Sequence, residues 1–600
     1  MSKKIPKSVS ISTADAARIQ SVSNQKSCAQ QRRNLEVNTI IWLDLNVSST
    51  NDNLSAKVRL RQAINHFETF EDKQKCIDHI VSLESEKIYF IISGSLGESV
   101  VPLIHDKPQT EAIYVFCFNK AKHEEWAKRY QKVCAVSTNI DDICDQLTKD
   151  VAVSSNNLVS MTAVSPNTNG KEINKQEASF MYFQLLVNIL THFAHKDSTK
   201  QELIDLCRMV YAGNNKEVNA IHQFHKAYSK EQAIEWYTKE CFLYRMLNKA
   251  LRTQDIDMLF KLGFFIQDLH EELRNLQISS TTRLGRTITV YRGLGIPNKE
   301  FESLQNKVGG LLSMNSFLST SVQEAVAPRF ARSSLGRSNT MPVLFEMVVD
   351  TEKCRQPFSN IDTVSDFSAE NGILFSMGTV FRIVSIKKLK KEDVWNVKLE
   401  LNGDEDIELS VLTNHMTREL GESNNLNTLG MLLIKMGENS RAQQYFQMLL
   451  ADTSLDQSAH ALALNNLGTV YKNQGDYEKA LKSYEKSLEI YLVSLPPNHP
   501  DIATTYNNVG LVYDNQGDYE KALKSYEKSL EIYLVSLPPN HPDIATTYNN
   551  IGVVYRHQGD YEKALKYYET SLKIRLISLP PNHPDIARTY NNIGVVYDNC

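Results

Sequence analysis

A block of 42 residues recurs almost unchanged through the C-terminal part of the chain and limits its fold more than any other feature. The sequence Asn-Asn-apolar-Gly begins at Asn465, Asn507, Asn549 and Asn591, so successive copies lie 42 residues apart. A unit of this size cannot bury an apolar face alone, and copies in tandem stack so that each covers its neighbour. The period therefore predicts an elongated repeat domain.

Each copy has the apolar spacing of two helices joined by a turn at Gly475-Asp476. The first helix is predicted by positions spaced i, i+3 and i+4, which are Leu467, Val470 and Tyr471. The second is predicted by a similar stripe, which is Tyr477, Ala480, Leu481, Tyr484, Leu488 and Leu492. Gly468 lacks a side chain, so a neighbouring helix can approach closely. Pro496-Pro497 ends the second helix, and Asp501 is expected to cap the next one.

Gly468, Tyr471 and Ala480 match the signature of tetratricopeptide (TPR) repeats, and the long period resembles the form seen in kinesin light chains. The resemblance implies an all-α TPR solenoid over residues 421–600, with a divergent copy at Asn427, three complete copies and one cut off at Cys600, as in a fragment. It also implies a groove that binds a protein or peptide. The paired asparagines suit a peptide backbone, because an amide donates and accepts. They are equally suited to hydrogen bonds between repeats.

The N-terminal part is divided by composition and by apolar patterning. Residues 1–35 are polar and aperiodic, which predicts disorder, and residues 36–150 alternate strand-like with helix-like segments. That alternation predicts an open parallel α/β sheet of unknown role, with strands at 38–45, 87–92, 112–118 and 133–137. Polar stretches at 151–174 and 391–420 are expected to be linkers.

Between these linkers the patterning is helical up to about residue 278 and strand-like from Thr287, which predicts an α+β domain over 175–390. Its strand half contains three separate polar signals. They are Arg292-Gly293 at a strand end, the segment from Asn315 to Ser321, and the segment from Glu370 to Ile383.

In this order, and after the helical half with Trp236-Tyr237, the three signals resemble the Arg…Ser-Thr-Ser…Glu-x-Glu arrangement of arginine-specific mono-ADP-ribosyltransferases. The resemblance implies that NAD is the substrate, that no metal is needed, and that a protein arginine is the acceptor. It assigns catalytic roles to Arg292, Ser319 and Glu370. It assigns NAD contacts to the following residues: Arg292, Gly293, Ser316, Ser319, Thr320 and Ser321. An arginine can donate two parallel hydrogen bonds to a phosphate, which agrees with a phosphate-binding role for Arg292.

The third signal departs from the family pattern. Leu374-Phe375 and Gly378-Thr379 fix the register, so the second glutamate of Glu-x-Glu falls on Gly372. Residues two apart on a strand stand roughly 6.5–7 Å apart, so Glu370 cannot simply replace it. Two hypotheses follow. The chain is an NAD-dependent transferase whose repeats recruit the target, or it is a catalytically impaired transferase-like adaptor that acts through its repeats.

Composition narrows the partners and the location. The formal charge of −4 gives no reason to expect nucleic-acid binding, and no apolar run reaches the length of about 18 residues that a membrane span needs. The nine cysteines form no CxxC pair, which argues against a zinc site. No secretory signal follows the first residues, so we expect a cytoplasmic protein.

Overall fold

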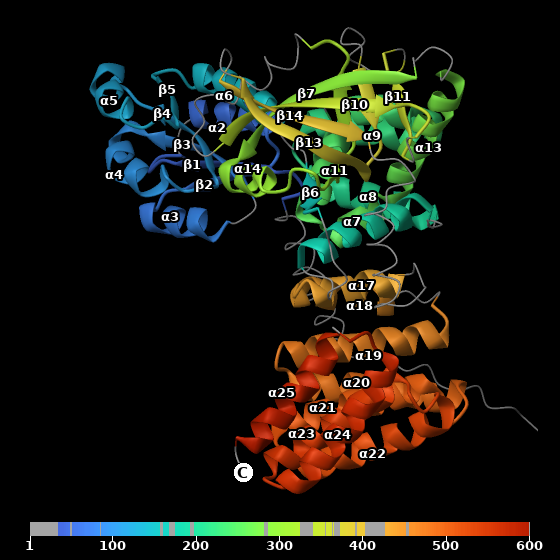
Figure 1. Ribbon diagram of the computed structural model, residues 1–600. Coiled ribbons are helices and arrows are strands. Elements are labelled where there is room, and N and C mark those ends of the chain that lie inside the picture. The colour runs from blue at the N-terminus through green and yellow to red at the C-terminus, as the bar shows by residue number, and fades with distance from the viewer. Residues whose placement is uncertain are drawn as a thin grey trace, which may run out of the picture. The chain divides into compact units, whose positions relative to one another are not determined.

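The computed structural model describes the chain in segments that together form two compact units. The described residues are 34–47, 51–83, 86–155, 160–166, 175–192, 197–239, 241–280, 286–324, 340–353, 356–362, 364, 372–389, 393–401, 426–451, 455–581 and 583–598. The first unit comprises residues 1–165 and 190–404, and the second comprises 166–189 and 405–600. Figure 1 shows strands in the first unit and stacked helices in the second.

The first unit begins with the predicted open α/β sheet. Its five parallel strands follow the order β2-β1-β3-β4-β5. They are β1 (Asn38–Leu43), β2 (Phe67–Phe70), β3 (Lys87–Ser93), β4 (Thr110–Phe116) and β5 (Val133–Ser137). The helices are α2 (Asn51–Ala63), α3 (Lys73–Ser82), α4 (Gly94–Ile104), α5 (Lys120–Ala127) and α6 (Ile140–Ser155). Alternate residues of β1 contribute side chains to two separate apolar cores. Ile41 lies in the core on one face of the sheet, and Trp42 lies in the core on the other face. Such two-sided burial is typical of parallel sheets covered by helices.

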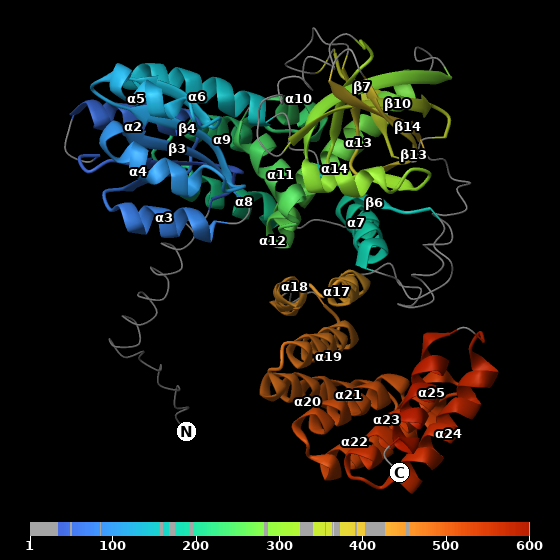
Figure 2. The same ribbon diagram turned by 60° about the vertical axis from the view of Figure 1, so that its left-hand side comes forward.

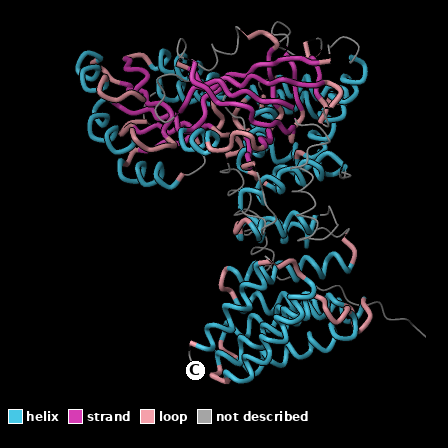
Figure 3. Tube along the Cα trace, viewed as in Figure 1, coloured by secondary structure: helices cyan, strands magenta, loops and turns pink. Residues whose placement is uncertain are grey.

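A second sheet of nine strands forms the rest of the first unit, in the order β11-β12-β9-β7-β10-β14-β13-β8-β6. Figure 3 shows these strands in magenta beside cyan helices. The strands are β6 (Met161–Val164), β7 (Thr287–Pro297), β8 (Leu311–Met314), β9 (Leu318–Ser321), β10 (Thr340–Asp350), β11 (Phe358–Asn360), β12 (Gly372–Phe375), β13 (Thr379–Leu389) and β14 (Val394–Leu401). The helices are α8 (Asp197–Val210), α9 (Asn215–Ala227), α10 (Ala233–Thr238), α11 (Phe242–Thr253), α12 (Ile256–Lys261), α13 (Gly263–Ser280) and α14 (Asn298–Gln305), with the 3₁₀ turn Lys230–Gln232. Most of the helices precede most of the strands along the chain, which confirms the predicted α+β order.

Three elements lie where the sequence pattern had placed other boundaries. Strands β6 and β14 fall inside the segments expected to be linkers, and both pair within the nine-stranded sheet. Helix α7 (Lys175–His192) begins the predicted transferase domain, yet most of it is grouped with the second unit. There the buried Tyr182 lies close enough to Arg441, Glu438 and Tyr445 for electrostatic interaction. This helix is apolar on every side, so its pattern alone does not say which domain it joins.

A buried ion triad joins the segment before β1 to helices α9 and α11 of the first unit. Arg245 of α11 donates to Glu36 before β1 at 2.9 Å and to Glu217 of α9 at 2.7 Å. The Glu36 carboxylate also accepts a hydrogen bond from Tyr211 at 2.8 Å. Both carboxylates are nearly inaccessible to water, with side-chain exposures of 4% and 2%. The charge of Glu36 is therefore compensated by Arg245 only while the segment before β1 stays against α11.

The second unit contains the predicted helix pairs, which Figure 2 shows stacked one on another. They are α17 (Leu426–Lys435), α18 (Asn439–Ala451), α19 (Gln457–Asn473), α20 (Tyr477–Ser494), α21 (Pro500–Gln516), α22 (Tyr519–Ser536), α23 (Pro542–His557), α24 (Tyr561–Ser578) and α25 (Pro584–Tyr597). Gly468 of α19 has the role expected of it. A Cβ there would lie 2.6 Å from the ring of Tyr484 on α20, closer than packing allows. The glycine thus sets how near the paired helices come.

Two local predictions for the repeats were wrong. Leu492 does not continue the apolar stripe of α20, because its side chain is 54% exposed and Tyr491 is buried instead. Seven residues span about two turns, so position 491 and not 492 follows Tyr484 on that face. Asp501 lies in the first turn of α21, and the cap is His499, whose ring accepts the Asp501 N–H.

Within the described ranges, no helix combines the length and the apolar run that crossing a membrane requires.

Arg245→Ala is expected to destabilise the first unit by about 3 kcal/mol, because it leaves Glu36 and Glu217 buried without their cation. All four tryptophans lie in that unit, so their fluorescence during urea unfolding reports its stability. Arg208→Ala is the matched control, because Arg208 is 43% exposed in an i,i+3 pair. The control should change stability by less than about 0.5 kcal/mol. Equal effects of the two variants would contradict the role of the triad.

Gly510→Ala and Gly594→Ala should have opposite effects, although the two glycines occupy equivalent repeat positions. A Cβ at 510 would lie 2.6 Å from the Tyr526 ring, whereas nothing lies within 4 Å of one at 594. The first change is expected to cost about 1–3 kcal/mol through overpacking. The second should gain up to about 1 kcal/mol of helix propensity. Thermal unfolding followed by circular dichroism measures both, and destabilisation by both variants would contradict the packing explanation.

Candidate active site

The three polar signals of the transferase-like domain lie on neighbouring strands. Tyr291 of β7 pairs with Ser321 of β9, and Ser321 pairs in turn with Gly372 of β12. Adjacent strands lie about 4.8 Å apart, so residues as far apart in the sequence as Tyr291 and Gly372 meet across two strand spacings. The fold thus brings these strands together, and strand alternation places Arg292, next to Tyr291, on the opposite face from Ser321 and Gly372.

Arg292 follows Tyr291 and is half-buried in β7. Val290 and Leu294, two residues to either side, belong to the apolar core of the sheet, so Arg292 points to that same side. Tyr237 of α10 is close enough for the Arg292 charge to affect it. Burial raises the pKa of the Tyr237 phenol well above its ordinary value, and the Arg292 charge opposes that rise.

Tyr237 is a site neighbour that the sequence analysis did not assign a role. Its ring lies 5.4 Å from that of Phe317 and 5.3 Å from that of Tyr244. Its hydroxyl donates to the Phe317 carbonyl at 3.4 Å. This aromatic group connects the helical half of the domain to the segment just before β9. The signal was present in Trp236-Tyr237, but periodicity cannot reveal which strand a helix residue will touch.

The Ser-Thr-Ser segment divides its side chains between two faces of β9. Thr320 is buried, and its hydroxyl donates to the Ile373 carbonyl of β12 at 2.9 Å, so it ties the two strands together. Ser319 is exposed, whereas Ser321 is buried and its hydroxyl accepts the Gln323 N–H at 3.1 Å. Alternation places Ser319 and Ser321 on one face and Thr320 on the other. Ser319 is therefore the member of the segment open to a ligand.

Ser316 lies before β9 and is almost completely buried, with 1% of its surface exposed. Gly293 is also buried, and it pairs with Leu344 of β10. Both positions offer a ligand less surface than Ser319 does.

Gly372 begins β12 in an environment with room for a side chain. A Cβ there would lie 3.7 Å from Ile361 and 4.0 Å from the Thr320 carbonyl, which are ordinary contacts. Its N–H donates to the Asp362 carboxylate at 2.8 Å. Neither space nor a left-handed backbone requires glycine here. The position expected to carry the catalytic carboxylate therefore has none, and Glu370 lies outside the described residues.

A hydrogen-bond chain from helix α13 reaches Ser376, the residue that follows β12. Arg274 donates to the Nε2 atom of His270 at 2.9 Å, so a neutral His270 donates through Nδ1 to the Ser376 hydroxyl, also at 2.9 Å. The imidazole therefore donates a hydrogen bond to the Ser376 hydroxyl and does not accept its proton as a general base would. Its part in the site is to hold β12 against α13.

The paired asparagines of the repeats form a ladder. The second asparagine of one copy donates to the first asparagine of the copy before it, at 3.1–3.2 Å, in the pairs Asn508–Asn465, Asn550–Asn507 and Asn592–Asn549. Hydrogen bonding between repeats, one of the two expected uses, is therefore realised. Each bond uses one of the four hydrogen bonds that an asparagine amide can make.

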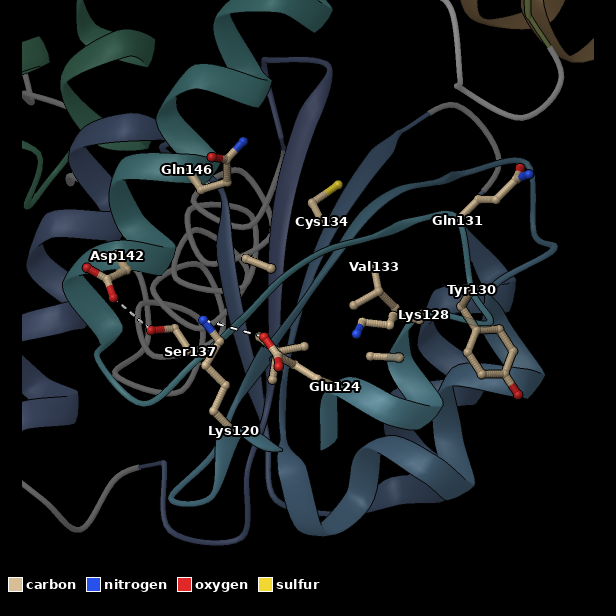
Figure 4. A pocket seen from close by; sticks show the side chains of 13 residues that line it. Lys120, Glu124, Lys128, Tyr130, Gln131, Val133, Cys134, Ser137, Asp142 and Gln146 are labelled. Carbon is tan, nitrogen blue, oxygen red and sulfur yellow. Dashed lines mark hydrogen bonds and ion pairs between the residues drawn. The ribbon is translucent and has the colours of Figure 1, made fainter. Parts of the chain in front are cut away.

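A shallow groove of 580 Å³ runs along the edge strand β5, between α5 and α6 (Figure 4). Two pairs of its side chains contact each other. Lys120 contacts Glu124 at 3.5 Å, and the Ser137 hydroxyl donates to Asp142 at 2.8 Å. The groove contains none of the three polar signals, so the strands around Arg292 remain the candidate active site.

Comparisons with known proteins agree with this division of the chain. Residues 214–406 match the family NAD:arginine ADP-ribosyltransferase, and residues 427–491, 460–534 and 543–598 match tetratricopeptide repeat families. The search of curated proteins finds no match.

Several solved structures are similar to part of the chain. BtubC (BKLC) from P. vanneervenii is 24% identical over 32% of this chain and 74% of its own, with a TM-score of 0.26. A putative kinesin light chain from Podosopora anserina, with nearly identical TPR-like repeats, is 18% identical over 29% and 84%, with a TM-score of 0.26. MamA is 23% identical over 28% and 91%, with a TM-score of 0.20.

The family matches and the fold lead to one conclusion. The chain carries a domain of the NAD:arginine ADP-ribosyltransferase family, which uses NAD as its substrate, followed by an array of TPR repeats of the kind that binds other proteins.

Proposed function

We propose that the transferase domain moves ADP-ribose from NAD to an arginine of a protein that the TPR array recruits. The alignment of Arg292's strand with the Ser-Thr-Ser strand and with β12 supports this proposal. The chain also joins the chemistry to a protein-binding array, which favours a protein acceptor over a small molecule.

We assign NAD binding to residues on and beside these strands, each according to the chemical group of NAD that its side chain or backbone suits. Arg292 holds a phosphate of NAD through its guanidinium fork. The Gly293 backbone meets the nicotinamide amide, and the exposed Ser319 orients the nicotinamide ribose. Thr320 supports the site through its hydrogen bond to β12, and Ser321 and Ser316 complete its lining.

The transfer step breaks the bond between the ribose C1′ atom and the nicotinamide nitrogen. Nicotinamide leaves with the electron pair, a guanidine nitrogen of the acceptor arginine forms the new bond to C1′, and that nitrogen loses a proton. Positive charge develops on the ribose as the old bond lengthens, and a carboxylate beside it lowers the barrier. Gly372 supplies no carboxylate, so we infer that Glu370 gives only partial compensation and that transfer is slow.

A second candidate function follows from the same observation. Glycine at the position paired with Ser321 favours a module that binds NAD without transferring ADP-ribose and acts as an adaptor. In that case the repeats carry the biological activity, and NAD is a ligand. The two candidates differ in whether the unmodified chain transfers any label.

Gly372→Glu is expected to raise the rate of label transfer from radiolabelled NAD to an arginine-rich acceptor by about a hundredfold. A Cβ fits at this position, because its nearest neighbour would be 3.7 Å away. Gly372→Gln is the matched control, since it has the same size without the charge, and should leave the slow rate unchanged.

Three outcomes of this assay are decisive. Slow transfer by the unmodified chain with acceleration only by glutamate supports the transferase. Transfer by the glutamate variant alone contradicts the proposal that this chain is an enzyme and supports the proposal that it is an adaptor. Equal rates in all three proteins would show that the carboxylate does not belong at position 372.

A further inference from the structure

The turn that follows β11 brings a carboxylate back against the first residue of β12. Ile361 continues the pairing of the two strands, because its N–H donates to the Gly372 carbonyl at 3.0 Å. Its own carbonyl accepts the Val364 N–H at 3.0 Å, so the chain makes a β-turn there and leaves the sheet. In a regular antiparallel pair the Gly372 N–H would bond to the Ile361 carbonyl. It donates instead to the Asp362 Oδ1 atom at 2.8 Å.

The Asp362 carboxylate is held at both of its oxygen atoms. Besides the Gly372 N–H on Oδ1, the side-chain amide of Asn360 donates to Oδ2 at 2.9 Å. The Asp362 N–H in turn donates to the Asn360 Oδ1 atom at 3.0 Å, which fixes the backbone of the turn. These two bonds use two of the roughly four acceptor sites of a carboxylate. Asp362 is only half-buried, so the carboxylate is fixed in place without being enclosed.

The position of this carboxylate suits the group that Gly372 lacks. An N–Cα bond is about 1.46 Å long, so Asp362 Oδ1 lies no more than about 4.3 Å from the Gly372 Cα atom. A residue two places along the strand, as Glu370 is, stands roughly 6.5–7 Å away. Because Gly372 pairs with Ser321, position 372 belongs to the face of the sheet that carries Ser321 and Ser319. The carboxylate of Asp362 therefore lies beside the strand position nearest to the proposed ribose site.

We propose that Asp362 supplies the carboxylate that stabilises the nicotinamide ribose during transfer. The inference rests on the proposed function and adds a second carboxylate to the partial contribution of Glu370. Nicotinamide still leaves with the electron pair, and the acceptor guanidine nitrogen still bonds to C1′ and loses its proton to water. The Asp362 carboxylate stays ionised throughout and forms no bond to C1′. Its negative charge lowers the energy of the positive charge that develops on the ribose.

The first test compares the full chain with its Asp362→Asn variant in transfer from radiolabelled NAD to the arginine-rich acceptor. Asparagine keeps the size of the side chain and an oxygen for the Gly372 N–H, but removes the charge. We expect kcat to fall by about tenfold or more and KM for NAD to change by less than about twofold, because the charge acts on the transition state. Asp393→Asn, at a 71% exposed aspartate between β13 and β14, is the matched control and should transfer at the unmodified rate.

The second test separates the charge of Asp362 from its hold on the turn. Asp362→Asn is combined with Gly372→Glu, so that a carboxylate is present at position 372 itself. The double variant should transfer as fast as Gly372→Glu alone, because the introduced carboxylate takes over the role of Asp362. A residue that only held the turn against β12 would slow transfer equally in both backgrounds.

The outcomes distinguish this inference from the proposed function. A loss of transfer in Asp362→Asn that disappears in the double variant supports the inference. Transfer by Asp362→Asn at the unmodified rate, or an equal loss in both backgrounds, would overturn the role of Asp362 and leave the transferase proposal standing. Absence of transfer by the unmodified chain would overturn both.

Discussion

The hydrogen-bonded register of β12 on β9, and of β9 on β7, determines what the transferase domain can do. Backbone pairing aligns Gly372 with Ser321 and Ser321 with Tyr291, and the Thr320 hydroxyl adds a bond to β12. Because side chains alternate along a strand, a one-residue shift of β12 would turn each of its side chains to the other face of the sheet. Burial of Ile373 and Phe375 in the core resists such a shift. The missing carboxylate is therefore a property of one side chain and not of a distorted sheet.

The repeat array follows a different physical principle. The copies are held by glycine-to-tyrosine contacts inside a pair and by asparagine bonds between neighbouring copies. Its stability is thus close to a sum of local terms. The ion triad of Arg245, by contrast, makes the segment before β1 and helices α9 and α11 depend on one another. A change in one repeat should therefore affect mainly that repeat and its neighbours. A change at the ion triad should affect several elements of the first unit together.

Much of the fold could be predicted from the sequence, because its signals are periodic. The 42-residue period gave the helix pairs, and alternation gave four of the five strands in the first sheet. Strand β2 is too short for its alternation to stand out, and β6 and β14 pair with distant segments that no local pattern identifies. For the site, the three polar signals are indeed brought to adjacent strands. Tyr237 was missed because its contact with Phe317 depends on tertiary packing.

The central claim is that the domain keeps its substrate-binding strands although Gly372 supplies no carboxylate. Isothermal titration of the full chain with NAD tests it most directly, because binding does not depend on the missing group. The account predicts saturable binding by the unmodified chain and an affinity lower by about tenfold or more in Arg292→Ala, which loses the phosphate fork. Absence of NAD binding, or equal binding by the two proteins, would contradict the account.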